Sequence, residues 1–185
     1  MGRGSSFIRV SRLMALSAIV CLQIAAFAQA TSAQPVPDAD AKVALIMDDI
    51  LRRGEGRAEG RPDVKTYTWV PPSADDIKQI REIGHDAIAP LSKALNPPYR
   101  RSFEQILAVR LLGEIGGADV VPPLKQALEP DKPNSVRFAA LVALLSVPDD
   151  LALPIIRSAV HDSDPLVARE AKELLTDYYQ LDLPK

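Results

Sequence analysis

Apolar residues recur in the same order in three stretches of the chain, each about 32 residues after the previous one. Within each stretch they stand three or four positions apart, which is the spacing of one face of an α-helix. The matching first segments are 88–95 (IAPLSKAL), 121–128 (VPPLKQAL) and 153–160 (LPIIRSAV), and the matching second segments centre on Ala108, Ala140 and Ala171. The pattern therefore predicts a helical hairpin that recurs over 85–116, 117–148 and 149–180.

A single hairpin of this kind cannot cover the apolar faces of both its helices, whereas hairpins that stack on one another bury them in a continuous core. We therefore predict an all-α fold, a right-handed α-solenoid of about three helical hairpins over residues 73–180. Ser73, with Asp76 three residues later, predicts the start of one further helix. That helix should cover 75–83, end at Gly84 and cap the N-terminal end of the stack.

The second helices differ in the outer positions of the central and last units. The central unit has apolar residues there, and the last unit has polar ones at the matching places: Phe138, Leu141, Val142 and Leu145 against Arg169, Lys172, Glu173 and Thr176. A middle helix has neighbours on both sides, whereas a terminal helix faces water. We therefore expect the central positions to be covered and the array to end with the last unit.

Residues 31–72 predict an extension that precedes the repeats. Asp38 or Asp40 can cap a helix that runs to Arg53, and its apolar residues are spaced so that one face packs against another element. The segment 52–61 (RRGEGRAEGR) places three glycines among charged residues. This composition indicates a flexible, charged link.

The segment 64–70 (VKTYTWV) alternates β-branched and aromatic residues and is the only strand-like stretch in the sequence. Side chains two positions apart on a strand point to the same side, so Tyr67 and Trp69 should share a face. Two interpretations follow. The two rings cover the open end of the repeat stack, or they contact a partner.

Both ends of the chain are expected to lie outside the packed fold. In residues 1–30, three arginines precede an apolar run and small residues follow, which is the layout of a secretory signal peptide cleaved after Ala30 or Ala28. The alternative is an uncleaved anchor, although the run is shorter than the ~20 residues of a spanning helix. Cleavage also removes Cys21, the only cysteine. We therefore expect a bacterial protein, periplasmic or secreted, without a stable membrane span. The tail 181–185 should fray.

The composition does not indicate catalytic or nucleic-acid chemistry. A net charge of -2 does not indicate a strongly basic face, so we expect no nucleic-acid partner. His85 and His161 are the only histidines, and neither has a second histidine or cysteine at ligand spacing. Adjacent aspartates do not converge on one point of a helix, and no G-x-S-x-G segment is present. We therefore expect no enzyme activity, no metal and no cofactor.

The repeats resemble those of the HEAT-repeat family, in particular its short bacterial form related to phycobilisome-lyase-type repeats. The similarity covers 73–180 and is carried by Pro122-Pro-Leu and Pro154-Ile-Ile in first helices and by SVRFAALVAL from Ser135 and DPLVAREAKELL from Asp164 in second helices. The resemblance implies a ladder that pairs an Asp of the inter-helix turn with an Arg early in the second helix. The candidates are Asp162 or Asp164 with Arg169, and Asp131 or Asn134 with Arg137; the first unit has Gln105 in place of the Arg.

Stacked helical pairs create an extended surface lined by their second helices, and such surfaces usually hold a protein or peptide. The candidate partner-binding residues are Arg101, Glu104, Arg137 and Arg169, together with Tyr67 and Trp69. The alternative role of Arg137 and Arg169 is to form the ladder. The function we expect is a non-catalytic scaffold or adaptor for protein–protein interaction in the bacterial cell envelope. The alternative is a lyase-like or enzyme-accessory module that holds a small ligand.

Overall fold

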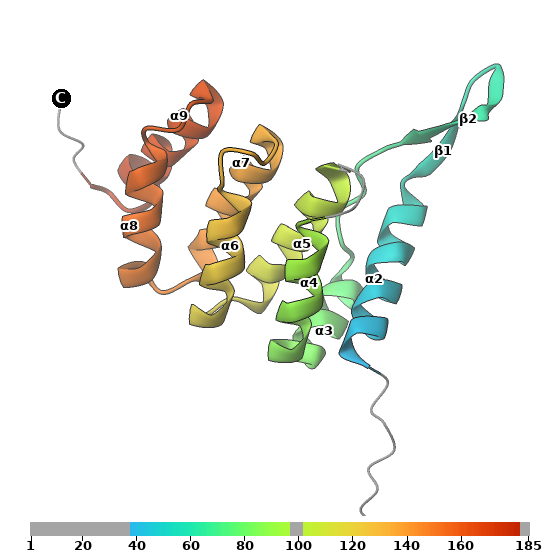
Figure 1. Cartoon of the computed structure of the whole chain (residues 1–185), viewed down its shortest axis with the longest axis horizontal. Coiled ribbons are helices and arrows are strands. Elements are labelled where there is room, and N and C mark those ends of the chain that lie inside the picture. The colour runs from blue at the N-terminus through green and yellow to red at the C-terminus, as the bar shows by residue number, and fades with distance from the viewer. Residues whose placement is uncertain (1–37, 97–101, 182–185) are drawn as a thin grey trace, which may run out of the picture. The chain divides into compact units, whose positions relative to one another are not determined.

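A computed structural model describes residues 38–96 and 102–181, and it is mostly helical (Figure 1). The predicted signal peptide at 1–30 and the residues 182–185 of the predicted tail lie outside the described residues. The elements are α2 (Ala39–Arg53), β1 (Glu55–Ala58), β2 (Arg61–Tyr67), α3 (Ala74–Ile83), α4 (Ile88–Ala94), α5 (Ser102–Ile115), α6 (Val121–Ala127), α7 (Asn134–Ala143), α8 (Asp149–Ala159) and α9 (Pro165–Glu173).

The helices pack in consecutive pairs, as the recurring pattern predicts. Helix α4 contacts α5, α6 contacts α7, and α8 contacts α9. The second members of the pairs also contact one another in succession, α5 with α7 and α7 with α9 (Figure 1). Helix α3, which precedes the pairs, contacts α5. The prediction of a helical repeat fold is therefore confirmed. None of the described helices is both long and apolar enough to cross a membrane.

Helices α5 and α7 approach each other closely at Gly113. A Cβ atom added to Gly113 of α5 would lie 3.1 Å from the Cβ of Ala143, so only a residue without a side chain fits there without a shift. Ala108 and Ala140 are fully buried, as the small residues of the pattern predict. Leu144, just after α7, is also fully buried. The second helices therefore form the centre of the core.

Helices α2 and α3 together cover the N-terminal side of this core. Val43, Ile46 and Ile50 of α2 are buried, which confirms that one face of this helix packs, and α2 contacts both α4 and α5. Helix α3 begins at the capping box of Ser73 and Asp76 and ends at Gly84, as predicted. The sequence predicted α3 alone as the cap, whereas the structure adds α2 to it.

The prediction of a flexible link at 52–61 is wrong, because residues 52–53 end α2 and residues 55–61 belong to a β-hairpin. Strand β1 pairs antiparallel with β2, in the register Glu55 to Tyr67. A Cβ atom on Gly54 would lie 2.2 Å from the carbonyl oxygen of Thr68, and one on Gly56 would lie 2.7 Å from Thr66 Oγ1. These glycines therefore permit a close approach between the chain segments. The predicted strand at 64–70 is confirmed for 64–67.

A link between charged side chains ties α2 to α3. The carboxylate of Asp76 accepts hydrogen bonds from Arg53 Nη2 at 2.5 Å and from the backbone N–H of Ser73 at 2.7 Å. Burial alone would raise the pKa of Asp76, but these hydrogen bonds from Arg53 and Ser73 together outweigh it and hold the pKa below its ordinary value of 3.8. The same hydrogen bond raises the pKa of Arg53.

Replacing Leu144 with alanine should lower the free energy of unfolding by about 2 to 5 kcal/mol, because the side chain is fully buried and its removal leaves a cavity. Leu45 offers a matched control, since it is 70% exposed on α2. Leu45→Ala should change the stability by less than about 0.5 kcal/mol. Urea denaturation followed by circular dichroism measures both. Equal effects of the two variants would contradict the helix register described here.

The depressed pKa of Asp76 predicts a loss of stability in acid. A carboxylate whose pKa is lower in the folded state stabilises the fold above its unfolded pKa, here 3.8, and this contribution is lost as the pH falls through the folded pKa. The unfolding free energy should therefore fall below about pH 4. Asp76→Asn should lower stability at pH 7 and weaken this dependence on pH. The control Asp75→Asn, at an exposed neighbouring position, should retain the dependence.

Candidate binding groove

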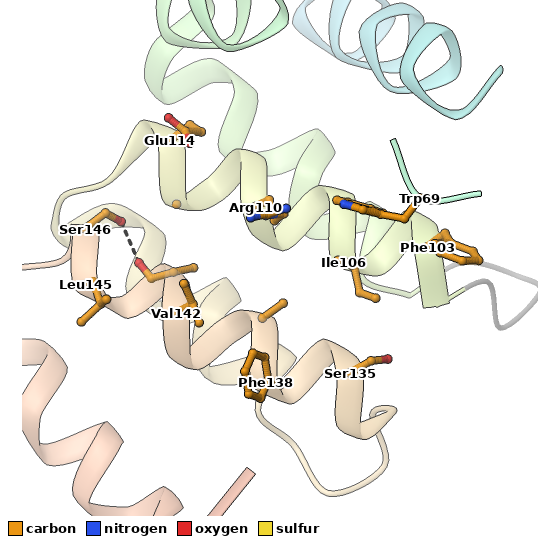
Figure 2. Close-up of a pocket in the computed structure, with 13 residues that line it drawn as sticks. Trp69, Phe103, Ile106, Arg110, Glu114, Ser135, Phe138, Val142, Leu145 and Ser146 are labelled. Atoms are coloured by element: carbon orange, nitrogen blue, oxygen red, sulfur yellow. Dashed lines mark hydrogen bonds between the residues drawn. The ribbon is translucent and has the colours of Figure 1, made fainter. Parts of the chain in front are cut away.

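An apolar groove of about 620 Å³ lies between the second helices α5 and α7 (Figure 2). Phe103 and Ile106 line it from α5, and Phe138 and Val142 line it from α7. Residues three, four or seven positions apart lie on one side of an α-helix, which is why each pair faces the groove. Leu145 and Ser146 lie beyond the end of α7 and complete the lining there.

The walls of this groove expose large apolar side chains. Phe103 and Val142 are each 41% exposed and Phe138 is 39% exposed, although they belong to helices whose other faces form the core. The sequence predicts that neighbouring helices cover Phe138 and Val142, and this prediction is wrong; of the outer positions of the central unit, only Leu141 is fully buried. Contiguous exposed apolar surface usually marks an interaction site.

Trp69 extends the groove at one end. It follows β2, and its ring stacks on that of Phe103, with centroids 6.3 Å apart and an angle of 15° between the planes. The guanidinium carbon of Arg110 lies 5.5 Å from the centre of the Trp69 ring, which is within the range of a cation–π interaction. Trp69 is partly buried against the core and also lines the groove, so both interpretations of this residue stay open.

The charged residues of the groove are not equally paired. Glu114 forms an ion pair of 2.8 Å with Arg81 of α3, whose Nε also donates to the backbone carbonyl of Glu114 at 3.2 Å. Arg110, one helical turn earlier on α5, has no ion pair with a carboxylate of the described residues, and its recorded interaction is with Trp69. The groove therefore presents an unneutralised positive charge beside apolar walls.

Arg137 is buried on the core side of α7 and takes part in a ladder, but it pairs with Asp162 and not with Asp131 or Asn134 as predicted. It is only 6% exposed. Its Nη1 donates to the backbone carbonyls of Lys132 at 2.8 Å and Pro130 at 3.2 Å, and its Nη2 donates to Asp162 at 2.9 Å. It therefore satisfies the turn of its own hairpin and holds the turn of the next one, and leaves no surface for a partner.

Other side chains continue the ladder across the turns. In the first hairpin Gln105 replaces the arginine, and its Nε2 donates to the carbonyl of Leu95 at 2.7 Å. Lys132 Nζ donates to Asn96 Oδ1 at 2.6 Å and so joins the turns of two hairpins. Asp164 caps α9 and accepts a hydrogen bond of 3.0 Å from Asn134, which lowers the pKa of Asp164.

The remaining predicted site residues do not gather in the groove. Arg169 is exposed on α9 and pairs with Glu173 at 3.4 Å, so it takes no part in the ladder. Glu104 is half-buried near the start of α5. Arg101 and the side chain of Tyr67 lie outside what the structure describes. Of the four candidates whose side chains the structure describes, Trp69 is the one that lines the groove.

Residues of the types that commonly act as metal ligands are scattered over the described part of the chain. His85 Nδ1 lies 3.2 Å from Asp119 with both side chains exposed, and His161 is on the turn before α9. No group of three or more His, Cys, Asp or Glu residues comes together within the described ranges. Among the described residues, the groove therefore offers apolar contact and the unpaired positive charge of Arg110 for binding.

Paired helices with a groove along their second members define a helical-repeat protein with an open binding surface. Residues 88–176 match the family model described as HEAT repeats. This match supports a place for the chain among HEAT-repeat proteins, which are commonly scaffolds for protein–protein interaction. No curated protein matches the chain.

Arg137→Ala should lower the free energy of unfolding by about 3 to 5 kcal/mol. Asp162 and two turn carbonyls would lose the hydrogen bonds that the buried guanidinium donates to them. Arg169→Ala provides the control, since that ion pair is exposed and should contribute less than about 0.5 kcal/mol. Chemical denaturation of both variants measures the difference. A small effect at Arg137 would mean that the ladder is not needed to hold the hairpins together.

Proposed function

We propose that this protein is a non-catalytic adaptor of the bacterial cell envelope, which holds another polypeptide along the groove between α5 and α7. The proposal includes a right-handed solenoid of three HEAT-like hairpins that follow the capping helices. The observation that carries it is the exposure of Phe103, Phe138 and Val142 on facing helices. Water contact with three large apolar side chains costs free energy that a bound segment recovers.

The form of the groove favours a polypeptide over a small ligand. A site for a small molecule usually encloses most of its ligand and fixes it with several convergent polar groups. Here Phe103, Phe138 and Val142 stay exposed to solvent on the two helices, and Glu114 is already paired with Arg81. A peptide can instead insert apolar side chains at intervals along such a groove. An enzyme-accessory module that holds a small ligand is the alternative, because about 620 Å³ would also accept one.

The envelope location rests on the sequence of residues 1–30. Charged, apolar and small residues follow one another there in the order of a secretory signal. We propose that the signal is cleaved after Ala30 or Ala28 and that the mature chain works in the periplasm or outside the cell. N-terminal sequencing of the exported protein tests this, and a chain that retains Met1 after export would contradict it.

Photo-crosslinking from within the groove tests the proposed function. A photoreactive amino acid at position 142, in cells that express the full chain, should form a covalent product with a polypeptide of the envelope. Phe138→Asp in the same chain should abolish the product, because a charge replaces an apolar contact in the groove. Leu166→Asp is the matched control, since Leu166 is exposed on α9 and does not line the groove.

Two results would contradict the proposal. One is a product that persists at the same level in Phe138→Asp, which would place the contact elsewhere. The other is the absence of any polypeptide product together with a small molecule that purifies with the protein and is released by Phe138→Asp, which would support the enzyme-accessory alternative.

A further inference from the structure

We infer that the segment bound in the groove is acidic as well as apolar, and that one of its Asp or Glu side chains pairs with Arg110. The inference rests on the proposed function and specifies the chemistry of the partner. It starts from the charge of the groove. Arg110 and Glu114 both line the groove, but only Glu114 has an ion-pair partner, Arg81, among the described residues.

The position of Arg110 suits it to receive a carboxylate. The guanidinium carbon of Arg110 lies 5.5 Å from the centre of the Trp69 ring, and this cation–π contact does not use the N–H groups of Arg110 as hydrogen-bond donors. A planar guanidinium whose donors are free in this way can bind both oxygens of a carboxylate. The contact would also be partly shielded from water by a bound segment, which strengthens a charge-assisted hydrogen bond.

The apolar residues place this carboxylate within a longer segment. Phe103 lies seven residues before Arg110 on α5, about 10 Å along the helix axis. Phe138 and Val142 face the same space from α7 (Figure 2). Phe103 lies toward one end of the groove from Arg110 and Leu145 lies toward the other (Figure 2), so the groove offers apolar contact on either side of the positive charge.

This arrangement favours an internal acidic side chain over the carboxylate at the end of a chain. The lining extends from Phe103 and Ser135, near the starts of α5 and α7, to Ser146 beyond the end of α7. A segment that occupies its length runs past Arg110 in both directions. We therefore assign the groove to a segment with bulky apolar residues and an Asp or Glu between them.

Selection from a displayed library of random 12-residue segments, each held between two folded domains so that it has no free terminus, tests this inference. The purified protein from the full chain should enrich segments that combine bulky apolar residues with Asp or Glu. Arg110→Glu should lose this preference and favour Lys or Arg instead. Arg110→Lys should keep the preference for acidic residues, since it keeps the charge, and Phe138→Asp should enrich none of these segments.

The affinity of one enriched segment gives a second measurement. Replacing its acidic residue with the matching amide should weaken binding to the unmodified protein about tenfold, as expected for the loss of one charge-assisted hydrogen bond. The same replacement should not weaken binding to Arg110→Gln, a variant without charge at this position. Fluorescence anisotropy measures each dissociation constant, and circular dichroism confirms that each variant is folded.

The outcomes separate this inference from the proposed function. Apolar segments without any acidic preference, bound equally by Arg110→Glu and lost in Phe138→Asp, would overturn the inference and leave the groove as a polypeptide site. Failure of the unmodified protein to enrich any segment above the Phe138→Asp control would overturn both.

Discussion

The fold depends on burial of the apolar sides of its second helices against one another. Helix α7 has α5 on one side and α9 on the other, and its contact with α5 is close enough that Gly113 has no room for a side chain beside Ala143. Neither helix can cover its apolar side within its own hairpin. Because this packing fixes how closely α5 and α7 approach, it also fixes the width of the groove that lies above their contact.

Stacking of hairpins brings their turns together, and the turns contain backbone carbonyls that need donors. Arg137 supplies two of these donors within its hairpin and reaches Asp162 of the next one. Gln105 can donate to the turn at Leu95 in the first hairpin, and the link to the neighbouring turn is made there by Lys132 instead. A buried carbonyl without a donor costs about 1 to 3 kcal/mol, so the polar ladder is a condition for the apolar stacking.

The sequence predicted what depends on local pattern and missed what depends on distant partners. Helical periodicity and the capping box at Ser73 act over a few residues, so the helices and the cap could be predicted. Glycines such as Gly54 and Gly56 occur both in flexible links and in hairpins. Only the positions of Thr66 and Thr68 in the fold distinguish the two cases. Likewise, the helical spacing of Phe138 is the same whether its side chain faces a neighbouring helix or solvent. The groove could therefore not be predicted from the sequence.

The N-terminal extension and the capping helix α3 contribute chemistry that the repeats do not contain. The match to HEAT repeats begins at residue 88, whereas Trp69 and Arg81 precede it. Trp69 stacks on Phe103 and contacts Arg110, and Arg81 neutralises Glu114. The repeats alone would present one positive and one negative residue in the groove, and the extension leaves only the positive one unpaired. The charge that this groove presents therefore depends on residues outside the family match.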